Sequence, residues 1–365
     1  NPYGFSDFSQ MERIPCLTRE LINENYHRLI SRKKTKNGFY QGYTGGSSGV
    51  PLKFLLDYDS IYMENAFIYN FRKKLGYRFS DRCATFRQID YGNELWHLNP
   101  MHNEIIFSPF RLSDKTVKTY TQKINSYKPH YLNGYLSSIW IFARLLEQNN
   151  VKLNFKIKGI FLISENVDFK QRKFVEEFFN TKAASFYGHS ERCVFAEEIE
   201  SGKYQFDPFY GYTEFQPYDK EKQLIVGTGF LNYTMPLIRY KTDDVCLKTG
   251  DFYYIDGKRA SNKGLLGANN EFLSSSVFDL ENPVFKNVLN YQFIQKEKGK
   301  AELHIVVNNQ FHKSELKLIE DEINRHTKEV IEIQIKIVDK LILSPRGKYQ
   351  MYIIELPDLK NNSTN

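Results

Sequence analysis

Residues 43–53 read Tyr-Thr-Gly-Gly-Ser-Ser-Gly-Val-Pro-Leu-Lys. Three glycines and three hydroxyl side chains fall within six residues of this stretch, and Lys53 follows shortly after. Glycine lets backbone N–H groups approach a ligand closely, and Ser and Thr add O–H donors, so such a loop is suited to phosphate oxygens. The Gly-Lys-Ser/Thr signature of a Walker loop is missing, and a plain surface loop rich in Gly and Ser is the alternative.

The bulk composition is that of a globular protein. The chain has 365 residues, of which 41% are hydrophobic and 25% charged, and its formal charge is +7. This length exceeds what one hydrophobic core usually serves, so we expect two domains. The densest basic run, residues 32–36, is either a solvated linker or a patch that steers anions. No sustained basic stripe with stacking aromatics is present, so no nucleic-acid partner is expected.

The cysteines and apolar runs predict a compartment. The four cysteines, Cys16, Cys83, Cys193 and Cys246, form no Cys-x-x-Cys pair and suggest no disulfide framework. Free thiols fit a reducing cytosol, so a cytoplasmic protein is expected. No apolar run has membrane-spanning length, and no signal peptide is visible. Because the chain begins at Asn1 rather than methionine, we expect that an N-terminal segment is missing.

The apolar pattern predicts alternating elements. Helices are predicted over residues 59–74, 136–148 and 169–179. Strands are predicted over residues 156–163 and 183–187, another begins with residues 223–226, and residues 237–240 continue the sheet region. This alternation indicates an α/β domain with largely parallel strand pairing.

The character of the chain changes near residue 256. Residues 257–264 are polar and typical of a linker between domains. A strand over residues 301–307, a helix capped at Ser314 and a strand over residues 331–338 follow. We therefore predict a large domain over residues 1–257 and a small α+β domain over residues 258–365.

Four further segments carry polar side chains where ligands collect. Ser164 and Glu165 follow one predicted strand, and the carboxyl ends of strands in open α/β sheets face ligands. The other three segments are Tyr187-Gly188-His189-Ser190-Glu191-Arg192, Leu237-Ile238-Arg239-Tyr240-Lys241-Thr242-Asp243-Asp244 and Ser344-Pro345-Arg346-Gly347-Lys348.

In this order, these segments and the loop at 43–53 resemble the adenylate-forming superfamily of acyl-CoA synthetases and adenylation domains. The phenylacetate–CoA ligase branch, and within it CapK-like proteins of polysaccharide biosynthesis clusters, is the nearest in form. Gly-Ser-Ser-Gly-x-Pro-Leu at 46–52, Tyr-Gly-His-Ser-Glu-Arg at 187–192 and Met-Pro-Leu-Ile-Arg-Tyr at 235–240 carry the resemblance. It extends from Thr18 to about Ile354. It implies a large α/β domain with mixed sheets and a small mobile C-terminal lid.

The resemblance implies roles for the loop and for two cations. The phosphate loop would comprise Thr44, Gly45, Gly46, Ser47, Ser48 and Gly49. Lys348 would bind the carboxylate and the α-phosphate, and Arg259 or Lys258 would reach the ribose or phosphate. Lys53 is displaced from its family position by Leu52, which leaves its role open.

The resemblance also implies roles for the segment at 187–192. Tyr187 and Gly188 would contact adenine, with the Tyr187 ring stacked on the base. Ser190 would contact phosphate, and Glu191 would hold Mg²⁺, a cation that prefers oxygen ligands. Ser164 and Glu165 would line the adenine edge. His189 is either a packed histidine or a group that touches the carboxylate or acts as a base.

One aspartate would bind the ribose, because a single carboxylate can accept two hydrogen bonds. The family pattern is Arg-Thr-Gly-Asp, and here the chain reads Lys241-Thr242-Asp243-Asp244. Asp243 stands where glycine is expected. Alignment favours Asp244, although either aspartate is able to serve.

The implied function is ATP-dependent activation of a carboxylic acid as an acyl-adenylate, followed by transfer to CoA or to an amine or amino-sugar acceptor. Catalysis would rest on Lys348 and Glu191, with ATP and Mg²⁺ as cofactors and CoA as a candidate second substrate. A homodimer is left open. A catalytically degenerate nucleotide-binding protein of the same fold is the alternative, and a basic scaffold protein has no positive feature in its favour.

Overall fold

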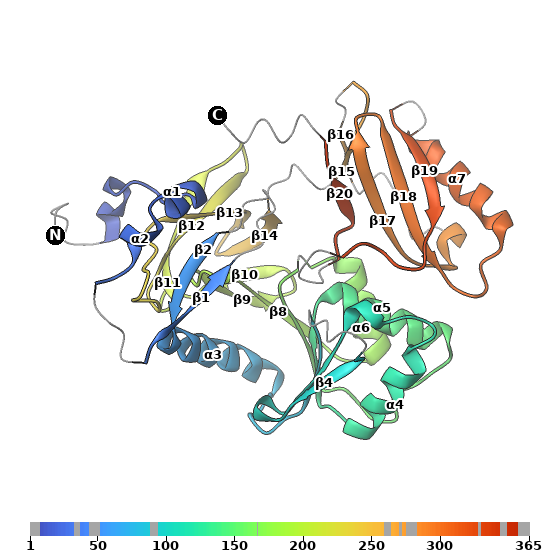
Figure 1. Ribbon diagram of the computed structural model, residues 1–365, viewed down its shortest axis with the longest axis horizontal. Coiled ribbons are helices and arrows are strands. Elements are labelled where there is room, and N and C mark those ends of the chain that lie inside the picture. The colour runs from blue at the N-terminus through green and yellow to red at the C-terminus, as the bar shows by residue number, and fades with distance from the viewer. Residues whose placement is uncertain are drawn as a thin grey trace. The chain divides into compact units, whose positions relative to one another are not determined.

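The computed structural model describes residues 8–32, 37–43, 52–87, 94–165, 167–258, 264–269, 272–274, 283–327, 330–343 and 349–356 (Figure 1). The chain divides into two compact units. Unit 1 comprises residues 1–81, 158–169 and 181–259, and unit 2 comprises residues 82–157, 170–180 and 260–365. The predicted α/β class with mixed sheets is confirmed, while the predicted domain boundary after residue 257 stays a prediction.

Unit 1 begins with short helices and a hairpin. These elements are η1 (Phe8–Arg13), α1 (Arg19–Glu24), α2 (Tyr26–Leu29), β1 (Phe39–Tyr43), β2 (Lys53–Asp57), α3 (Tyr58–Arg72) and η2 (Lys73–Leu75). The side chain of Asp57 caps α3 by accepting a hydrogen bond from the Ser60 N–H. The helix predicted over residues 59–74 is confirmed, but it starts one residue earlier and ends at Arg72, where η2 follows.

The remaining strands of unit 1 form a mostly antiparallel sheet. Its order is β11-β12-β13-β14-β10-β9-β8-β7. The strands are β7 (Gly159–Leu162), β8 (Ala183–Gly188), β9 (Phe195–Glu200), β10 (Lys203–Phe206), β11 (Gly211–Pro217), β12 (Lys222–Gly229), β13 (Tyr240–Thr249) and β14 (Phe252–Lys258). Only β7 and β8 pair in parallel among these. The expectation of largely parallel pairing is therefore wrong for this sheet.

The segment 237–240, expected to continue the sheet region, does so only at its last residue, because β13 begins at Tyr240. Arg239 has a left-handed backbone with φ 52°, which departs from the extended conformation of a regular strand. Its guanidinium is buried against Glu214, with Nη2 2.9 Å from Oε1 and Nε 3.0 Å from Oε2. A two-point ion pair of this kind, and not strand pairing, fixes the segment before Tyr240.

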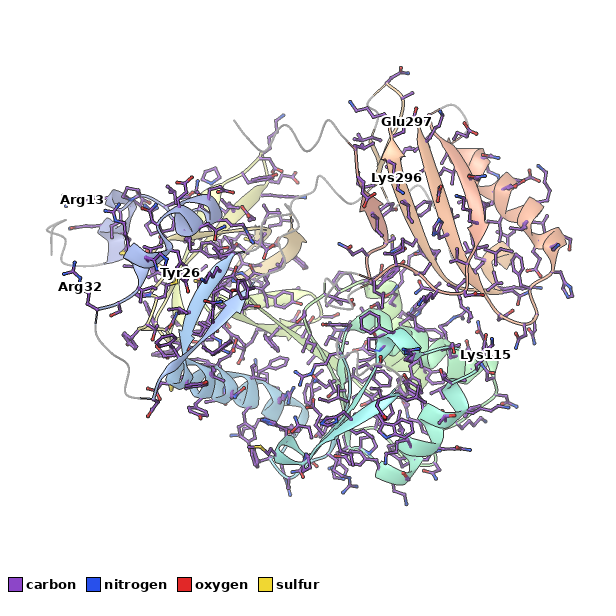
Figure 2. All side chains as sticks on the ribbon, in the orientation of Figure 1. Arg13, Tyr26, Arg32, Lys115, Lys296 and Glu297 are labelled. Atoms are coloured by element: carbon purple, nitrogen blue, oxygen red, sulfur yellow. The ribbon has the colours of Figure 1, made fainter. Side chains whose placement is uncertain are left out.

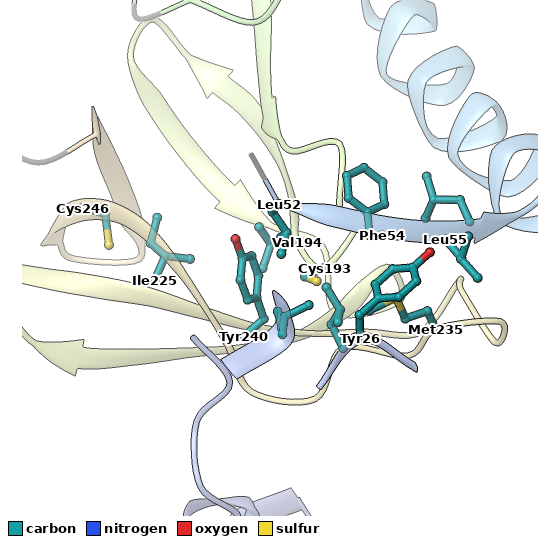
Figure 3. Packing of buried hydrophobic residues seen from close by; sticks show 13 residues of the cluster. Tyr26, Leu52, Phe54, Leu55, Cys193, Val194, Ile225, Met235, Tyr240 and Cys246 are labelled. Atoms are coloured by element: carbon teal, nitrogen blue, oxygen red, sulfur yellow. The ribbon is translucent and has the colours of Figure 1, made fainter. Parts of the chain in front are cut away.

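The core of unit 1 joins its first helices, its hairpin and its sheet. Tyr26, labelled in Figure 2, packs with Leu52, Phe54 and Leu55 against Met235. Tyr240, Cys193, Val194, Ile225 and Cys246 belong to the same cluster (Figure 3). Burial of these side chains, at about 25 cal/mol per Å² of apolar surface, holds the elements that carry the candidate site.

Unit 2 contains a second set of strands and helices. They are β3 (Cys83–Phe86), β4 (Trp96–Asn99), η3 (Pro100–His102), β5 (Glu104–Phe107), η4 (Pro109–Arg111), α4 (Val117–Tyr127), β6 (Tyr131–Gly134), α5 (Leu136–Gln148) and α6 (Phe169–Phe179). The strand order is β6-β3-β5-β4, and β3 pairs in parallel with both β5 and β6. The helices predicted over residues 136–148 and 169–179 are confirmed at both ends.

The C-terminal part of unit 2 is a four-stranded sheet with one helix. Its elements are β15 (Gly264–Leu266), β16 (Phe272–Ser274), η7 (Pro283–Phe285), β17 (Val288–Glu297), β18 (Lys300–Val307), α7 (Lys313–Thr327), β19 (Glu332–Ile337) and β20 (Tyr352–Ile354). The order is β19-β18-β17-β20, with β18 and β19 parallel, and Lys296 and Glu297 mark the end of β17 in Figure 2. The predicted β-α-β pattern is confirmed. Ser314 lies inside α7 and does not cap it.

Within the described ranges, no helix combines the length and the apolar character that a bilayer crossing requires.

Candidate functional site

The turn between β8 and β9 presents the motif at 187–192. Gly188 pairs with Phe195 across the two antiparallel strands, so the residues between them form the connection. The Arg192 N–H donates to the His189 carbonyl at 3.0 Å, and Arg192 has φ 56°. This tight turn leaves Ser190 exposed and turns Glu191 inward.

Ser164 and Glu165 reach the same edge of the sheet. They follow β7, which runs parallel to β8, with Leu162 opposite Ser185. Since parallel strands end at one edge, this places them beside the start of the motif at Tyr187. Ser164 is exposed and has a left-handed backbone with φ 60°.

Three side chains of the predicted nucleotide site touch one another. The Tyr187 hydroxyl donates to Oδ2 of Asp244 at 2.9 Å, and its oxygen lies 2.7 Å from Nε2 of His189. A hydroxyl has one proton, so His189 Nε2 must be the donor toward Tyr187. Nδ1 of His189 is buried and has no hydrogen-bond partner among the described residues. In a neutral imidazole this atom is an acceptor.

Tyr187 keeps its proton at neutral pH. Burial raises the pKa of Tyr187 well above its usual value, and the negative charge of Asp244 raises it further. The Tyr187 hydroxyl therefore remains protonated and donates a hydrogen bond to one oxygen of the Asp244 carboxylate.

The two aspartates at 243 and 244 face different partners. Asp243 has φ 65°, and its Oδ2 lies 3.9 Å from Nε of Arg19. Its side chain is 35% exposed, whereas that of Asp244 is 12% exposed. Glycine adopts such a φ without cost, so the backbone at Asp243 is one that suits the glycine expected there from the resemblance. The contacts with Tyr187 and His189 belong to Asp244, as the alignment expects of the ribose ligand.

Glu191, in the motif at 187–192, is a second buried carboxylate, at 6% exposure. The Tyr240 hydroxyl donates to its Oε1 at 3.1 Å. Burial and the charge of Glu191 raise the pKa of Tyr240, so this hydroxyl also stays protonated. Oε2 of Glu191 forms no hydrogen bond or ion pair with any other described residue.

The donor set at Glu191 fits Mg²⁺ held jointly with a nucleotide. Among the described residues, no group of three or more His, Cys, Asp or Glu side chains converges on a common point. Mg²⁺ is usually held by one or two carboxylates together with substrate phosphates, and not by an all-protein cage. Glu191 meets that requirement, because it is a buried carboxylate whose Oε2 accepts no hydrogen bond from another described residue.

A second buried ion pair supports the turn. Nη2 of Arg192 lies 2.8 Å from Oε2 of Glu64 in α3, and the Tyr210 hydroxyl donates to the other carboxylate oxygen at 3.2 Å. Burial raises the pKa of Glu64, while Arg192 and the Tyr210 hydrogen bond oppose the rise. Arg192 therefore anchors the turn to α3, a role that the motif alone does not predict.

Two glycines allow the sheet to approach the turn. A Cβ on Gly229 would lie 2.5 Å from the Arg192 carbonyl oxygen, and one on Gly211 would lie 2.4 Å from that of Cys193. Any side chain at either position would push the segment after Glu191 away from β11 and β12.

Eight predicted site residues lie outside the described part of the chain. They are Thr44, Gly45, Gly46, Ser47, Ser48, Gly49, Arg259 and Lys348. The strands that flank the loop pair with Tyr43 opposite Lys53. Nζ of Lys53 sits 4.4 Å from the centroid of the Tyr26 ring, while Leu52 is fully buried.

Sequence reasoning missed Tyr240, Glu64 and Tyr210 as parts of this site. Glu64 contacts Arg192 of the motif although it is distant from it in sequence. Tyr210 is likewise distant in sequence from Glu64, to which it donates a hydrogen bond. A buried guanidinium requires an acidic partner, but only the structure shows that Arg192 is buried.

The C-terminal part of the chain matches a known family model. Residues 265–355 match the family model described as the CapK C-terminal domain. Protein CapK of Staphylococcus aureus is 25% identical over 366 aligned residues, which cover 94% of this chain and 80% of the relative.

Solved structures then identify the architecture. A 2-hydroxyisobutyryl-CoA ligase in the postadenylation state, bound to R3-HIB-AMP, superimposes with a TM-score of 0.70 at 14% identity, covering 99% of this chain and 85% of that one. The chain has the adenylate-forming ligase fold. An anthranilate CoA ligase, AuaEII, in complex with anthranoyl-AMP shares this adenylate-forming fold at a TM-score of 0.57 and 14% identity, covering 86% of this chain and 66% of that one. The resemblance of the sequence to adenylate-forming and CapK-like proteins is thus confirmed.

Proposed function

We propose that this protein activates a carboxylic acid with ATP, releases pyrophosphate and passes the acyl group from the acyl-adenylate to an acceptor. The observation that carries the proposal is the meeting of Tyr187, His189 and Asp244 beside the inward Glu191, in a fold shared with CoA ligases. These are the residue types that a base, a ribose and a magnesium-bound phosphate require.

Each described residue has a role in this proposal. The Tyr187 ring stacks on adenine, and Asp244 accepts hydrogen bonds from the ribose hydroxyls. Gly188 leaves room beside the base, and Ser164 and Glu165 line its edge. The exposed Ser190 hydroxyl donates to phosphate. Glu191 holds Mg²⁺, which when bound offsets the negative charge of the phosphates.

Three further groups belong to the proposal by resemblance alone. The loop Thr44-Gly45-Gly46-Ser47-Ser48-Gly49 binds the β- and γ-phosphates, Arg259 contacts the ribose or phosphate, and Lys348 pairs with the substrate carboxylate and the α-phosphate. Chemically, a carboxylate oxygen attacks the α-phosphorus, the bond to the pyrophosphate oxygen breaks, and pyrophosphate leaves. Preorganised cations lower the barrier between two anions, and loss of one such contact typically costs ~10²–10³ in rate.

The acceptor, the second domain and the compartment complete the proposal. CoA is the acceptor in one form, and an amine such as an amino sugar is the acceptor in the other, which would suit a role in capsule or surface polysaccharide biosynthesis. Residues 258–365, which include the matched segment 265–355, would act as a mobile lid. The four free thiols support a cytoplasmic location.

ATP–pyrophosphate exchange across a panel of carboxylic acids tests the activity. We expect exchange with at least one acid, and a loss of at least 100-fold in Glu191→Gln. ATP binding without exchange for any acid would instead favour a catalytically inactive nucleotide-binding protein. Replacing CoA with candidate amines in the transfer reaction then separates the two acceptor classes.

A further inference from the structure

The side chain of Tyr240, which lies outside the motif at 187–192, is tightly held by its surroundings. Its ring is 1% exposed and packs in the core cluster with Val194, Cys193 and Ile225 (Figure 3). A fully packed aromatic ring has little freedom to rotate away, because the surrounding side chains fill the space that it would need.

The backbone at Tyr240 is fixed as well. Leu17 forms a parallel bridge with Tyr240, in which the Leu17 N–H donates to the Arg239 carbonyl and the Lys241 N–H donates to the Leu17 carbonyl, each at 2.9 Å. Arg239 is held in turn by the two-point pair with Glu214. The hydroxyl of Tyr240 is therefore a fixed point to which a mobile carboxylate can be tied.

The Tyr240 hydroxyl forms a hydrogen bond with one of the two carboxylate oxygens of Glu191. It donates to Oε1 at 3.1 Å, and Oε2 has no hydrogen bond or ion pair with another described residue. A glutamate has three side-chain torsions, and tying one oxygen removes most of the freedom of the other. The hydrogen bond thus sets the direction in which Oε2 points.

We infer that Tyr240 is a positioning residue that aims Oε2 of Glu191 at the Mg²⁺ of bound Mg·ATP. This inference rests on the proposed function, because it requires Glu191 to be the magnesium ligand. Tyr240 itself touches neither the metal nor the nucleotide. Partners that orient metal ligands typically contribute 10–100-fold to metal affinity.

The test compares Tyr240→Phe with Tyr120→Phe. Tyr120 is a matched control, since it is fully buried and its hydroxyl donates to the Ser108 carbonyl at 2.7 Å in unit 2. Calorimetric ATP titrations at graded Mg²⁺ concentrations give the Mg²⁺ midpoint for tight binding. We expect Tyr240→Phe to raise this midpoint about tenfold, with ATP affinity in EDTA unchanged. Tyr120→Phe should leave both values unchanged.

Rescue separates positioning from a general loss of packing. Tyr240→p-aminophenylalanine keeps the ring and a hydrogen-bond donor, so the midpoint should return to within threefold of the wild-type value. If Tyr240→Phe proves too unstable to titrate, the p-aminophenylalanine variant still fills the core and can be measured instead. A Mg²⁺ midpoint of that variant as high as the midpoint of Glu191→Gln would overturn the inference.

The variant Glu191→Gln separates the positioning role of Tyr240 from the proposed magnesium-binding role of Glu191. If Glu191→Gln raises the Mg²⁺ midpoint and Tyr240→Phe does not, the positioning role is wrong while the proposed function stands. If neither variant changes the midpoint, Glu191 is not the magnesium ligand, and the inference falls together with that part of the proposed function.

Discussion

The hydroxyl of Tyr187 donates a hydrogen bond to Oδ2 of Asp244 at 2.9 Å, across 57 residues of sequence. This contact joins the residue proposed to stack on adenine to the residue proposed to bind the ribose. In the same way, the Tyr240 hydroxyl donates to Oε1 of Glu191 at 3.1 Å. Asp244 and Glu191 thus each accept a hydrogen bond from a tyrosine hydroxyl.

Tyr187→Phe should separate the ring from the hydroxyl. Loss of a hydrogen bond to a buried carboxylate should lower the free energy of unfolding by about 1–3 kcal/mol, measured by urea denaturation. ATP affinity should change less than Tyr187→Ala changes it, because the phenyl face still stacks, and stacking contributes about 1–3 kcal/mol per base. Equal losses of ATP affinity in the two variants would argue against stacking.

Asp243→Gly should be tolerated, whereas Asp244→Asn should not. Glycine removes the cost of the left-handed backbone, about 1 kcal/mol, and this gain offsets the loss of the partly exposed pair with Arg19. ATP affinity of Asp243→Gly, measured by calorimetry, should stay within threefold of wild type, and that of Asp244→Asn should fall about tenfold or more. The opposite ranking would make Asp243 the ribose ligand.

Arg192→Met should destabilise the protein in a pH-dependent way. Breaking a buried ion pair typically costs about 3–5 kcal/mol, and loss of the cation raises the pKa of Glu64 further, since Arg192 now opposes that rise. A carboxyl group with a raised folded-state pKa adds stability below its unfolded pKa and loses it as pH rises through the folded value.

The stability penalty of Arg192→Met should therefore be larger at pH 7.5 than at pH 4.5, as urea denaturation at the two pH values would report. The double variant with Glu64→Gln serves as the control, because it has no carboxyl group to titrate at that position. A penalty independent of pH would mean that Glu64 does not depend on Arg192.

Gly229→Ala should displace the turn that presents Glu191. The added Cβ would meet the Arg192 carbonyl oxygen at 2.5 Å, and backbone atoms yield only by moving the chain. We expect a loss of about 1–3 kcal/mol in unfolding free energy together with weaker ATP binding. Gly250→Ala is the control, since its Cβ meets nothing within 4 Å and only the φ of 61° opposes it. Unchanged ATP affinity in Gly229→Ala would show that the turn does not need this close approach.

Local patterns predicted the helices well and the sheet of unit 1 poorly. The helices over residues 136–148 and 169–179 have clear apolar periodicity, and the structure confirms their ends. Strand pairing depends on partners distant in sequence, so the antiparallel ladders of β9 to β14 were not foreseen. Arg239 illustrates the limit, because its buried pair with Glu214 overrides a strand-like apolar run.

The candidate site divides in the same way. The order of the motifs predicted that Tyr187, Asp244 and Glu191 serve one site, and the structure brings Tyr187 and Asp244 into contact. Nothing in the local sequence around Tyr240 or Glu64 indicates that each holds a residue of the 187–192 motif. Such supporting contacts form only through tertiary packing, which periodicity and spacing do not report.

The fate of an oxygen label tests carboxylate activation most directly. In the proposed reaction one oxygen of the acid attacks the α-phosphorus and stays on AMP when the acceptor displaces it. With an acid labelled with oxygen-18 in both carboxyl positions, mass spectrometry should find one labelled oxygen in AMP and none in pyrophosphate. Label in orthophosphate, with ADP as the nucleotide product, would contradict the account.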